Sequence, residues 1–182
     1  EKNPNVALSS CRFMTLKNGV ISSGGCGGKC DNESVKALLL VTNPILHPGI
    51  IAKADVIKEL GYDKNFTCTE DMELWTRFVM SGYKIEIIPE YLMIYRLHDK
   101  QITSTTLERQ RTEVLGIEKK YYAALVSELN EEMYDFYING IYFKNDSNAD
   151  KFLEYARWLR RKAENFDKAD INYALFEVLC EH

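Results

Sequence analysis

The sequence lacks any long apolar run. No stretch of its 182 residues approaches the roughly 20 apolar residues that a membrane-spanning helix needs. The opening residues, Glu1 to Pro4, also lack the character of a signal peptide. The formal net charge is −4, which argues against broad nucleic-acid binding. We therefore expect a cytoplasmic protein with no nucleic-acid partner.

Motifs that would hold phosphate or zinc are incomplete. Residues 19–28 contain five of the ten glycines, but no Gly-Lys-Ser/Thr ending follows them. The simpler interpretation is a mobile surface loop near an acceptor groove. Cys26 and Cys30 are spaced Cys-x3-Cys, and a zinc ion would need Cys11 or His47 as further ligands. The odd total of five cysteines favours reduced thiols.

Proline is absent from the second part of the chain, because all four prolines lie at or before Pro89. Apolar residues recur there at helical spacing. Residues 106–182 therefore predict three to four helices, one of them at 133–143 and another opened by Asp170. Two helix starts are marked by capping pairs, Thr105 with Glu108 and Ser147 with Asp150.

The first part carries strand and turn signals. Residues 6–16 alternate as a strand, and Lys17-Asn18-Gly19 is the turn after it. Residues 34–40 predict a short helix or strand, and residues 54–60 predict a helix that Gly61 ends. Strands followed by many helices give an α+β fold class.

Residues 66–98 are the stretch around which the rest is organised. A loop leads to Glu70 and Asp71, which head a helical pattern, and Gly82 supplies its left-handed stop. Four apolar positions of this pattern would be buried: Leu74, Trp75, Phe78 and Val79.

After this helix, residues 83–88 predict a strand. Pro89-Glu90 would break it, and residues 91–97 predict a second strand. Arg96 and His98 then lie at the far strand end. Polar groups held at the ends of rigid elements are what a binding site needs.

This stretch resembles the second half of the catalytic domain of family 2 glycosyltransferases, which have the GT-A fold. The residues that carry the resemblance are Asn43-Pro44-Ile45-Leu46-His47, Gly61-Tyr62-Asp63, Glu70-Asp71, Leu74-Trp75, Arg77, Gly82-Tyr83-Lys84, Pro89-Glu90 and Tyr95-Arg96-Leu97-His98. The resemblance implies that residues 1–105 are the acceptor-side half of an α/β GT-A domain. Residues 106–182 would be a C-terminal helical region.

The resemblance also implies a donor-binding half with a metal-binding Asp-x-Asp. Residues 3–8 match the segment just after that motif, and the sequence contains no Asp-x-Asp. We therefore expect a fragment that is inactive alone. The full-length enzyme would use Mn²⁺ or Mg²⁺.

Within the resemblance, Asp71 fits the catalytic base and Glu70 would orient the acceptor. We expect the helix start to keep Asp71 ionised and to lower its basicity. The alternative is that both carboxylates simply complement the positive end of a helix.

Four further residues are candidates for binding. Trp75 would wall the acceptor site or pack in the core, and His47, in the tight turn of residues 47–49, would bind an acceptor sugar or be structural. Arg96 would face the diphosphate. His98 would complete the metal site, or be a solvated loop histidine.

The function implied is inverting sugar transfer from a UDP- or GDP-sugar to a saccharide or lipid-linked acceptor, as in bacterial envelope polysaccharide synthesis. Peripheral contact with the inner membrane fits this setting. A basic cluster could meet anionic lipids or be a solvated helix face: Arg157, Arg160, Arg161 and Lys162. The alternative function is a non-enzymatic helical module for protein interaction.

Overall fold

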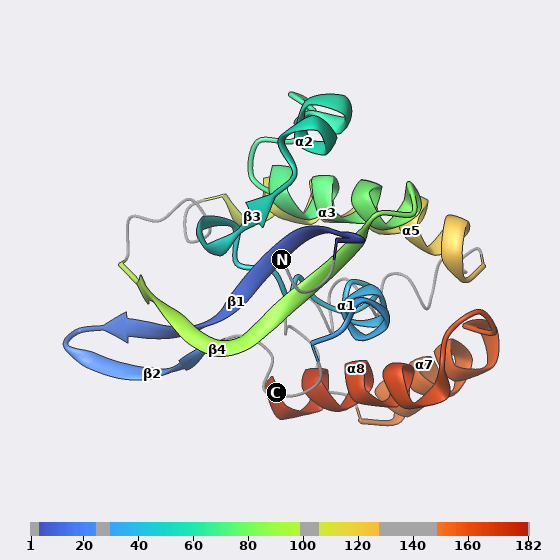
Figure 1. Cartoon of the computed structure of the whole chain (residues 1–182). Coiled ribbons are helices and arrows are strands. Elements are labelled where there is room, and N and C mark those ends of the chain that lie inside the picture. Colours follow the sequence, from blue (N-terminus) through green and yellow to red (C-terminus); the bar gives the residue numbers. More distant parts are fainter. Residues whose placement is uncertain (1–3, 25–29, 99–105, 128–148, 182) are drawn as a thin grey trace.

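The computed structural model describes residues 4–24, 30–98, 106–127 and 149–181, which form an α+β structure (Figure 1). Its strands are β1 (Val6–Lys17), β2 (Val20–Gly24), β3 (Ile51–Ala52) and β4 (Lys84–Arg96). Its helices are α1 (Asn32–Leu38), the 3-10 turn η1 (His47–Gly49), α2 (Ala54–Leu60), α3 (Glu70–Met80), α5 (Leu107–Leu125), α7 (Ala149–Lys162) and α8 (Lys168–Glu181). None of the helices in these ranges is long and apolar enough to cross a membrane.

Strand β1 pairs with every other strand of a mixed four-stranded sheet. β2 and β3 pair with it antiparallel, and β4 pairs with it in parallel. Asn18 and Gly19 connect β1 to β2 with φ angles of 52° and 82°. Two consecutive positive φ angles are typical of the type I′ turn, which matches the twist of a hairpin. The predicted strand over residues 6–16 and its turn are therefore confirmed.

Strand β4 shows that the prediction of two strands separated by Pro89 and Glu90 is wrong. One continuous strand runs over residues 84–96. Its pairing with β1 passes from Ile88 directly to Tyr91, so the two residues between them have no partner in β1. A proline lacks the N–H that a ladder needs, and a bulge accommodates it without ending the strand.

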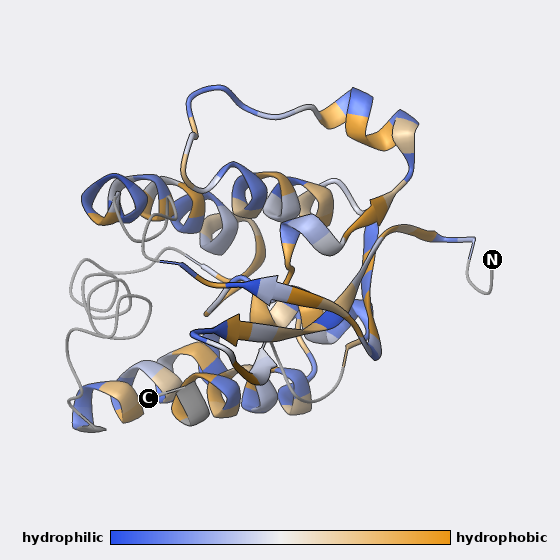
Figure 2. Cartoon of the chain, turned by 90° about the vertical axis from the view of Figure 1, so that its left-hand side faces the viewer, coloured by the Kyte–Doolittle hydropathy of each residue, from blue (hydrophilic) through white to orange (hydrophobic). Residues whose placement is uncertain are grey.

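Helices cover the sheet on two sides (Figures 1 and 2). α3 and α5 pack together on one side, and α1, α7 and α8 lie on the other. α1 begins after Asp31, whose carboxylate accepts the backbone N–H of Ser34 at 3.0 Å. This cap satisfies a free donor of the first turn, which explains why the segment predicted as helix or strand is a helix.

One hydrophobic core joins the first part of the chain to the C-terminal helices. Tyr122 of α5 donates its O–H to the carbonyl of Leu40 at 2.6 Å. Ser34 of α1 donates its hydroxyl to the Asp170 carboxylate of α8 at 3.0 Å. The boundary between residues 105 and 106 stays a prediction, and residues on both sides of it contribute to this core.

The described part of residues 106–182 is helical, as predicted. α5, α7 and α8 account for three helices, and Asp170 lies in the first turn of α8. α5 follows Thr106, whose side chain makes no capping hydrogen bond. The helix predicted at 133–143, and the proposed capping residues Thr105 and Ser147, lie outside the described residues.

Two helices end at glycines, as predicted. Gly61 follows α2 with φ of 60°, and Gly82 follows the end of α3 with φ of 80°. Arg77 of α3 donates to the carbonyls of Leu60 and Gly61 at 2.6 and 2.7 Å. It also donates to both carboxylate oxygens of Glu73 at 2.6 Å. These bonds fix the end of α2 against α3.

Candidate functional site

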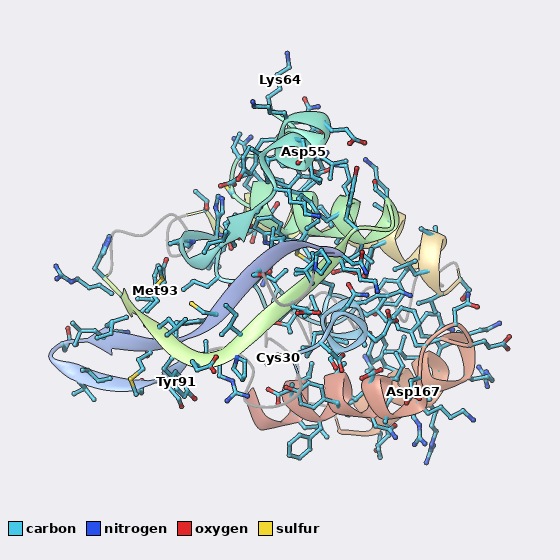
Figure 3. The ribbon with its side chains drawn as sticks, in the orientation of Figure 1. Cys30, Asp55, Lys64, Tyr91, Met93 and Asp167 are labelled. Carbon is cyan, nitrogen blue, oxygen red and sulfur yellow. The ribbon has the colours of Figure 1, made fainter. Side chains whose placement is uncertain are left out.

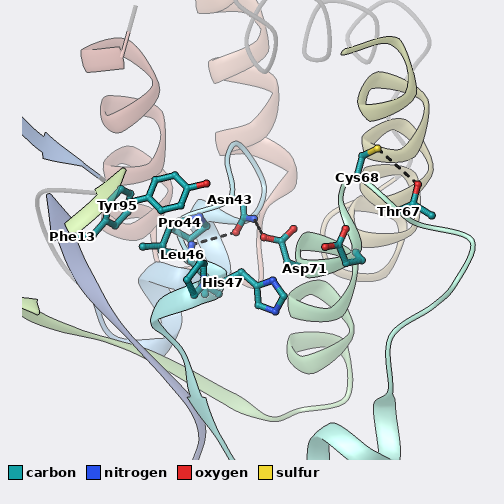
Figure 4. A pocket seen from close by; sticks show the side chains of 12 residues that line it. Phe13, Asn43, Pro44, Leu46, His47, Thr67, Cys68, Asp71 and Tyr95 are labelled. Carbon is teal, nitrogen blue, oxygen red and sulfur yellow. Dashed lines mark hydrogen bonds between the residues drawn. The ribbon is translucent and has the colours of Figure 1, made fainter. Parts of the chain in front are cut away.

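A pocket of about 370 Å³ opens between the sheet, the segment before η1 and the start of α3 (Figure 4). It brings together three of the predicted site residues, Glu70, Asp71 and His47. Its lining comes from separate segments of the chain: Phe13, Asn43, Pro44, Ile45, Leu46, His47, Pro48, Thr67, Cys68, Glu70, Asp71 and Tyr95.

Glu70 and Asp71 reach the pocket from the first turn of α3, where the unpaired N–H groups of the helix favour negative charge. The helix is anchored because its apolar face is fully buried. The residues of that face are Met72, Leu74, Trp75 and Phe78. The two carboxylates remain half-buried beside this rigid element.

The Asp71 carboxylate is held by two hydrogen bonds. Asn43 donates its Nδ2–H to Oδ2 at 3.2 Å, and the backbone N–H of Met72 donates to Oδ1 at 2.7 Å. Burial is the largest influence on this group and raises the pKa of Asp71. The Met72 N–H, the charge of His47 and the Asn43 amide oppose it, and the Glu70 charge adds to it. The net rise corrects the expectation that the helix start would lower the basicity of Asp71.

Asn43 is a site residue for which no role is predicted from the sequence. While its amide N–H binds Asp71, its Oδ1 accepts the backbone N–H of Ile45 at 3.2 Å. The second bond closes a turn across Pro44 and fixes which way the amide points. The Asn-Pro pair was the available signal, because Asn before Pro favours turn formation.

His47 lines the pocket from the start of η1. Its Nε2 lies 2.8 Å from the Tyr62 hydroxyl, and its ring meets the Trp75 ring edge-on with centroids 5.7 Å apart. Trp75 is 0% exposed and does not line the pocket. Of the two places expected for Trp75, the structure therefore supports the core position, behind His47, and not the acceptor wall.

Tyr62 is a second residue that the sequence did not mark for a role. Burial, followed by the charges of Asp71 and Glu70, raises the pKa of its hydroxyl. The phenol therefore stays protonated close to both carboxylates and to His47. Together, the two carboxylates can accept a proton, and the Tyr62 hydroxyl and the His47 ring beside them can donate hydrogen bonds.

Glu113 of α5 holds the loop that precedes α3. Its carboxylate accepts the backbone N–H groups of Thr67 and Cys68 at 3.1 and 3.0 Å, the Thr69 hydroxyl at 2.9 Å and the Arg109 Nε–H at 2.8 Å. Burial alone would raise its pKa, but these bonds outweigh burial and lower the pKa of Glu113 to about 2. Thr67 and Cys68 line the pocket, so Glu113 fixes one of its walls from outside.

Arg96 and His98 lie at the end of β4, both exposed, and neither lines the pocket, although the neighbouring Tyr95 does. Within the described ranges, no three His, Cys, Asp or Glu side chains are grouped as a metal site requires. A metal ion at His98 would need ligands from elsewhere. Its metal role, and the diphosphate role of Arg96, stay predictions.

The Gly-rich segment is described only at its ends, because residues 25–29, with Cys26, lie outside the described structure. Cys30 is half-buried and accepts a hydrogen bond from Arg12 Nη2 at 3.9 Å. Cys11 is buried. Residues 20–24 form strand β2, which corrects the expectation of a mobile loop for that part, and the expectation for residues 25–28 stays a prediction.

Comparison with known proteins gives a partial similarity to a glycosyltransferase. Over 104 residues the chain is 25% identical to an uncharacterized glycosyltransferase of Methanocaldococcus jannaschii. This similarity relates the chain to glycosyltransferases. The match covers 57% of the chain and 36% of the relative, so the chain spans about a third of that protein's length. No protein-family model and no solved structure matches the chain.

Proposed function

We propose that this chain forms the acceptor-side part of a GT-A, family 2 glycosyltransferase in which Asp71 is the general base. The observation that carries the proposal is a half-buried carboxylate of raised pKa inside a pocket of about 370 Å³. The similarity to a glycosyltransferase supports the choice of reaction. The whole protein would transfer a sugar from a UDP- or GDP-sugar to a saccharide or lipid-linked saccharide.

In this reaction the acceptor hydroxyl gives its proton to Asp71 while its oxygen forms a bond to the anomeric carbon of the donor. The bond from that carbon to the nucleotide diphosphate breaks on the opposite face, so the configuration inverts. Asn43 and Met72 fix the carboxylate before the acceptor arrives, which lowers the entropy cost of reaching the reactive geometry. A positioned base of this kind contributes about 10²–10⁴-fold to the rate.

The other pocket residues have supporting roles in the proposal. Glu70 and His47 accept or donate hydrogen bonds to neighbouring hydroxyls of the acceptor, and Tyr62 orients the imidazole through its hydroxyl. Phe13 and Tyr95 give the pocket an aromatic side against which a sugar ring can pack. This division of polar and apolar surface suits a saccharide.

The donor side of the reaction remains outside the pocket. A Mn²⁺ or Mg²⁺ ion, when bound, would neutralise charge on the leaving diphosphate. The described residues do not form its site by themselves. In our proposal Arg96 and His98 act there only together with residues from another part of the protein.

The proposed setting is bacterial envelope polysaccharide synthesis in the cytoplasm, with peripheral contact to the inner membrane. It rests on the resemblance to family 2 enzymes. The alternative of a non-enzymatic helical module is less favoured, because α5, α7 and α8 bury apolar side chains in the core that they share with the sheet.

The test compares Asp71→Asn with Asp55→Asn in the full protein. Asp55 is an exposed aspartate in the first turn of α2, so the control makes the same chemical change at a similar helix position. Sugar transfer is measured by release of the nucleotide diphosphate. We expect Asp71→Asn to lose about 10²–10⁴-fold in turnover at unchanged donor affinity, and Asp55→Asn to match wild type. Near-normal turnover of Asp71→Asn would exclude it as the base.

A further inference from the structure

A second pocket, of about 300 Å³, lies where α7 and α8 meet. Every side chain that lines it is cationic: Arg157, Arg160, Arg161 and Lys168. The first arginine is three and four residues before the other two, so α7 presents all three on one face. The lysine comes from the first residue of α8. This basic pocket shares no residue with the Asp71 pocket.

None of these four cations is ion-paired with a carboxylate of the described residues. Asp167, next to Lys168 in the sequence (Figure 3), accepts the backbone N–H of Ala169 at 2.6 Å and so serves the start of α8. Like charges at three- and four-residue spacing on a helix repel one another. Cations gathered in this way in a chain of net charge −4 form a local site for an anion.

The helix that carries the three arginines, α7, is packed against the core. Trp158, which lies among them on α7, is 6% exposed and points into the core. Its ring stacks with those of Tyr122 and Tyr155, at centroid distances of 6.0 and 6.1 Å. The inner face of α7 is therefore fixed, so the backbone positions of the exposed arginines are set before any ligand binds, and only their side chains remain to be ordered.

We propose that the basic pocket binds a phosphate or diphosphate group. A guanidinium can donate two parallel hydrogen bonds to phosphate oxygens, and Lys168 adds a point charge. The volume is at the lower end of the roughly 300–1,000 Å³ range of ligand pockets, which suits a small phosphorylated group. The negative charge of the rest of the chain disfavours an extended polyanion. The phosphate belongs either to a dissolved metabolite or to a lipid headgroup.

The test has two arms and a matched control. One arm titrates inorganic pyrophosphate into the full protein by calorimetry. The other measures co-sedimentation with phosphatidylcholine vesicles, with and without phosphatidic acid. Arg160→Gln removes one lining charge, whereas Lys162→Gln removes an equal charge from the same helix at an exposed position that does not line the pocket. Arg157→Gln repeats the test at a second lining position, and thermal unfolding checks that all variants fold.

We expect binding in at least one arm, weakened about tenfold by Arg160→Gln or Arg157→Gln and by less than about twofold by Lys162→Gln. Binding of pyrophosphate identifies a dissolved ligand, and binding only to vesicles that contain phosphatidic acid identifies a lipid. Absence of binding in both arms would overturn the proposal. Equal weakening by Arg160→Gln and Lys162→Gln would overturn it too, because the effect would then be general attraction and not a site.

Discussion

Asp71 lies where burial and hydrogen bonding act on a carboxylate in opposite directions, and burial prevails. The folded state therefore binds the Asp71 proton more tightly than the unfolded state, in which the pKa has its ordinary value. As pH rises from that value through the raised folded pKa, the free energy of unfolding falls. At neutral pH the ionised carboxylate weakens the fold, a cost that is common where a site needs a charge in a half-buried position.

We predict that Asp71→Asn raises the melting temperature near neutral pH. The asparagine keeps the shape and can still accept the Met72 N–H through its one amide oxygen. It loses the bond from Asn43, but it carries no charge to desolvate, and we expect the second effect to prevail. Near pH 3 the gain should disappear, because the aspartate is then protonated in both folded and unfolded states. Differential scanning calorimetry at both pH values measures this, with the exposed Asp55→Asn as control. A lower melting temperature for Asp71→Asn at neutral pH would contradict the assignment.

Glu113 gives the opposite dependence on pH. Its folded pKa of about 2 lies below the ordinary value of 4.5, so its contribution is fully present above pH 4.5 and is lost as pH falls toward 2. We predict that Glu113→Gln lowers the free energy of unfolding by roughly 3 kcal/mol at neutral pH, from the size of this shift. Urea denaturation measures the loss. The difference from wild type should shrink as pH falls through that window.

The control for Glu113→Gln is Glu108→Gln, on the same helix but with the side chain 89% exposed in a pair with Arg111. It should cost less than about 1 kcal/mol. Under the proposed function, Glu113→Gln should also raise KM for the acceptor in the full protein, because the loop that carries Thr67 and Cys68 lines the pocket. Equal costs for the two variants would show that Glu113 does not position this loop.

At the scale of elements, Arg77 of α3 connects its own helix to the end of α2, and an ion pair with Glu73 within α3 holds the guanidinium in place. The Glu73 side chain is only 9% exposed, and Arg77 also donates hydrogen bonds to two carbonyls at the end of α2. We predict that Arg77→Ala costs about 3 kcal/mol, because it leaves Glu73 buried without a partner. The double variant Arg77→Met, Glu73→Leu should recover most of this loss. Chemical denaturation of Arg77→Ala, of this double variant and of the single variants Arg77→Met and Glu73→Leu measures the coupling, and additive costs would refute it.

The elements that the sequence predicted well are those whose signals are local. Asn18-Gly19 requires only its own backbone preferences, and Gly61 ends α2 by the same reasoning. The sequence predicts a break at Pro89, whereas β4 is a single strand. The bulge that accommodates Pro89 is defined by the pairing of β4 with β1. Pairing partners distant in the sequence leave no periodic signal within the strand itself.

The same reason limited the prediction of the site. Glu70, Asp71 and His47 are implied by the resemblance to family 2 glycosyltransferases, and the pocket does bring them together. Asn43 and Glu113 were not, since their contacts with the site join residues 28 and 44–46 positions apart. The direction of the Asp71 pKa also depends on burial, which the local helix start does not reveal.

At the scale of the whole molecule, the shared core predicts one cooperative unfolding transition. The chain has two tryptophans, Trp75 in α3 and Trp158 in α7, on either side of the predicted boundary at residue 105. The variants Trp75→Phe and Trp158→Phe each leave one fluorescent reporter. Their urea transitions should coincide with the transition seen by far-UV circular dichroism of the same variant. If the two tryptophans report different urea midpoints, and each midpoint differs from the one seen by circular dichroism, the chain would instead contain two independent domains.

The pairing of β1 with β4 also bears on how the chain reaches its fold. β1 forms its parallel ladder with β4, residues 84–96. The Ser34 hydroxyl donates to Asp170, which lies 136 residues further along the chain. Contacts of such sequence separation require large loops to close before they stabilise anything, which slows folding. During synthesis the β1–β2 hairpin can form as it emerges, and α1 can then contact β4 and α5, but the face of α1 that packs on α8 stays uncovered until α8 leaves the ribosome. We therefore expect nascent chains that stop before residue 168 to expose the face of α1 that contacts α8 and to engage chaperones, and release of α8 to end that engagement.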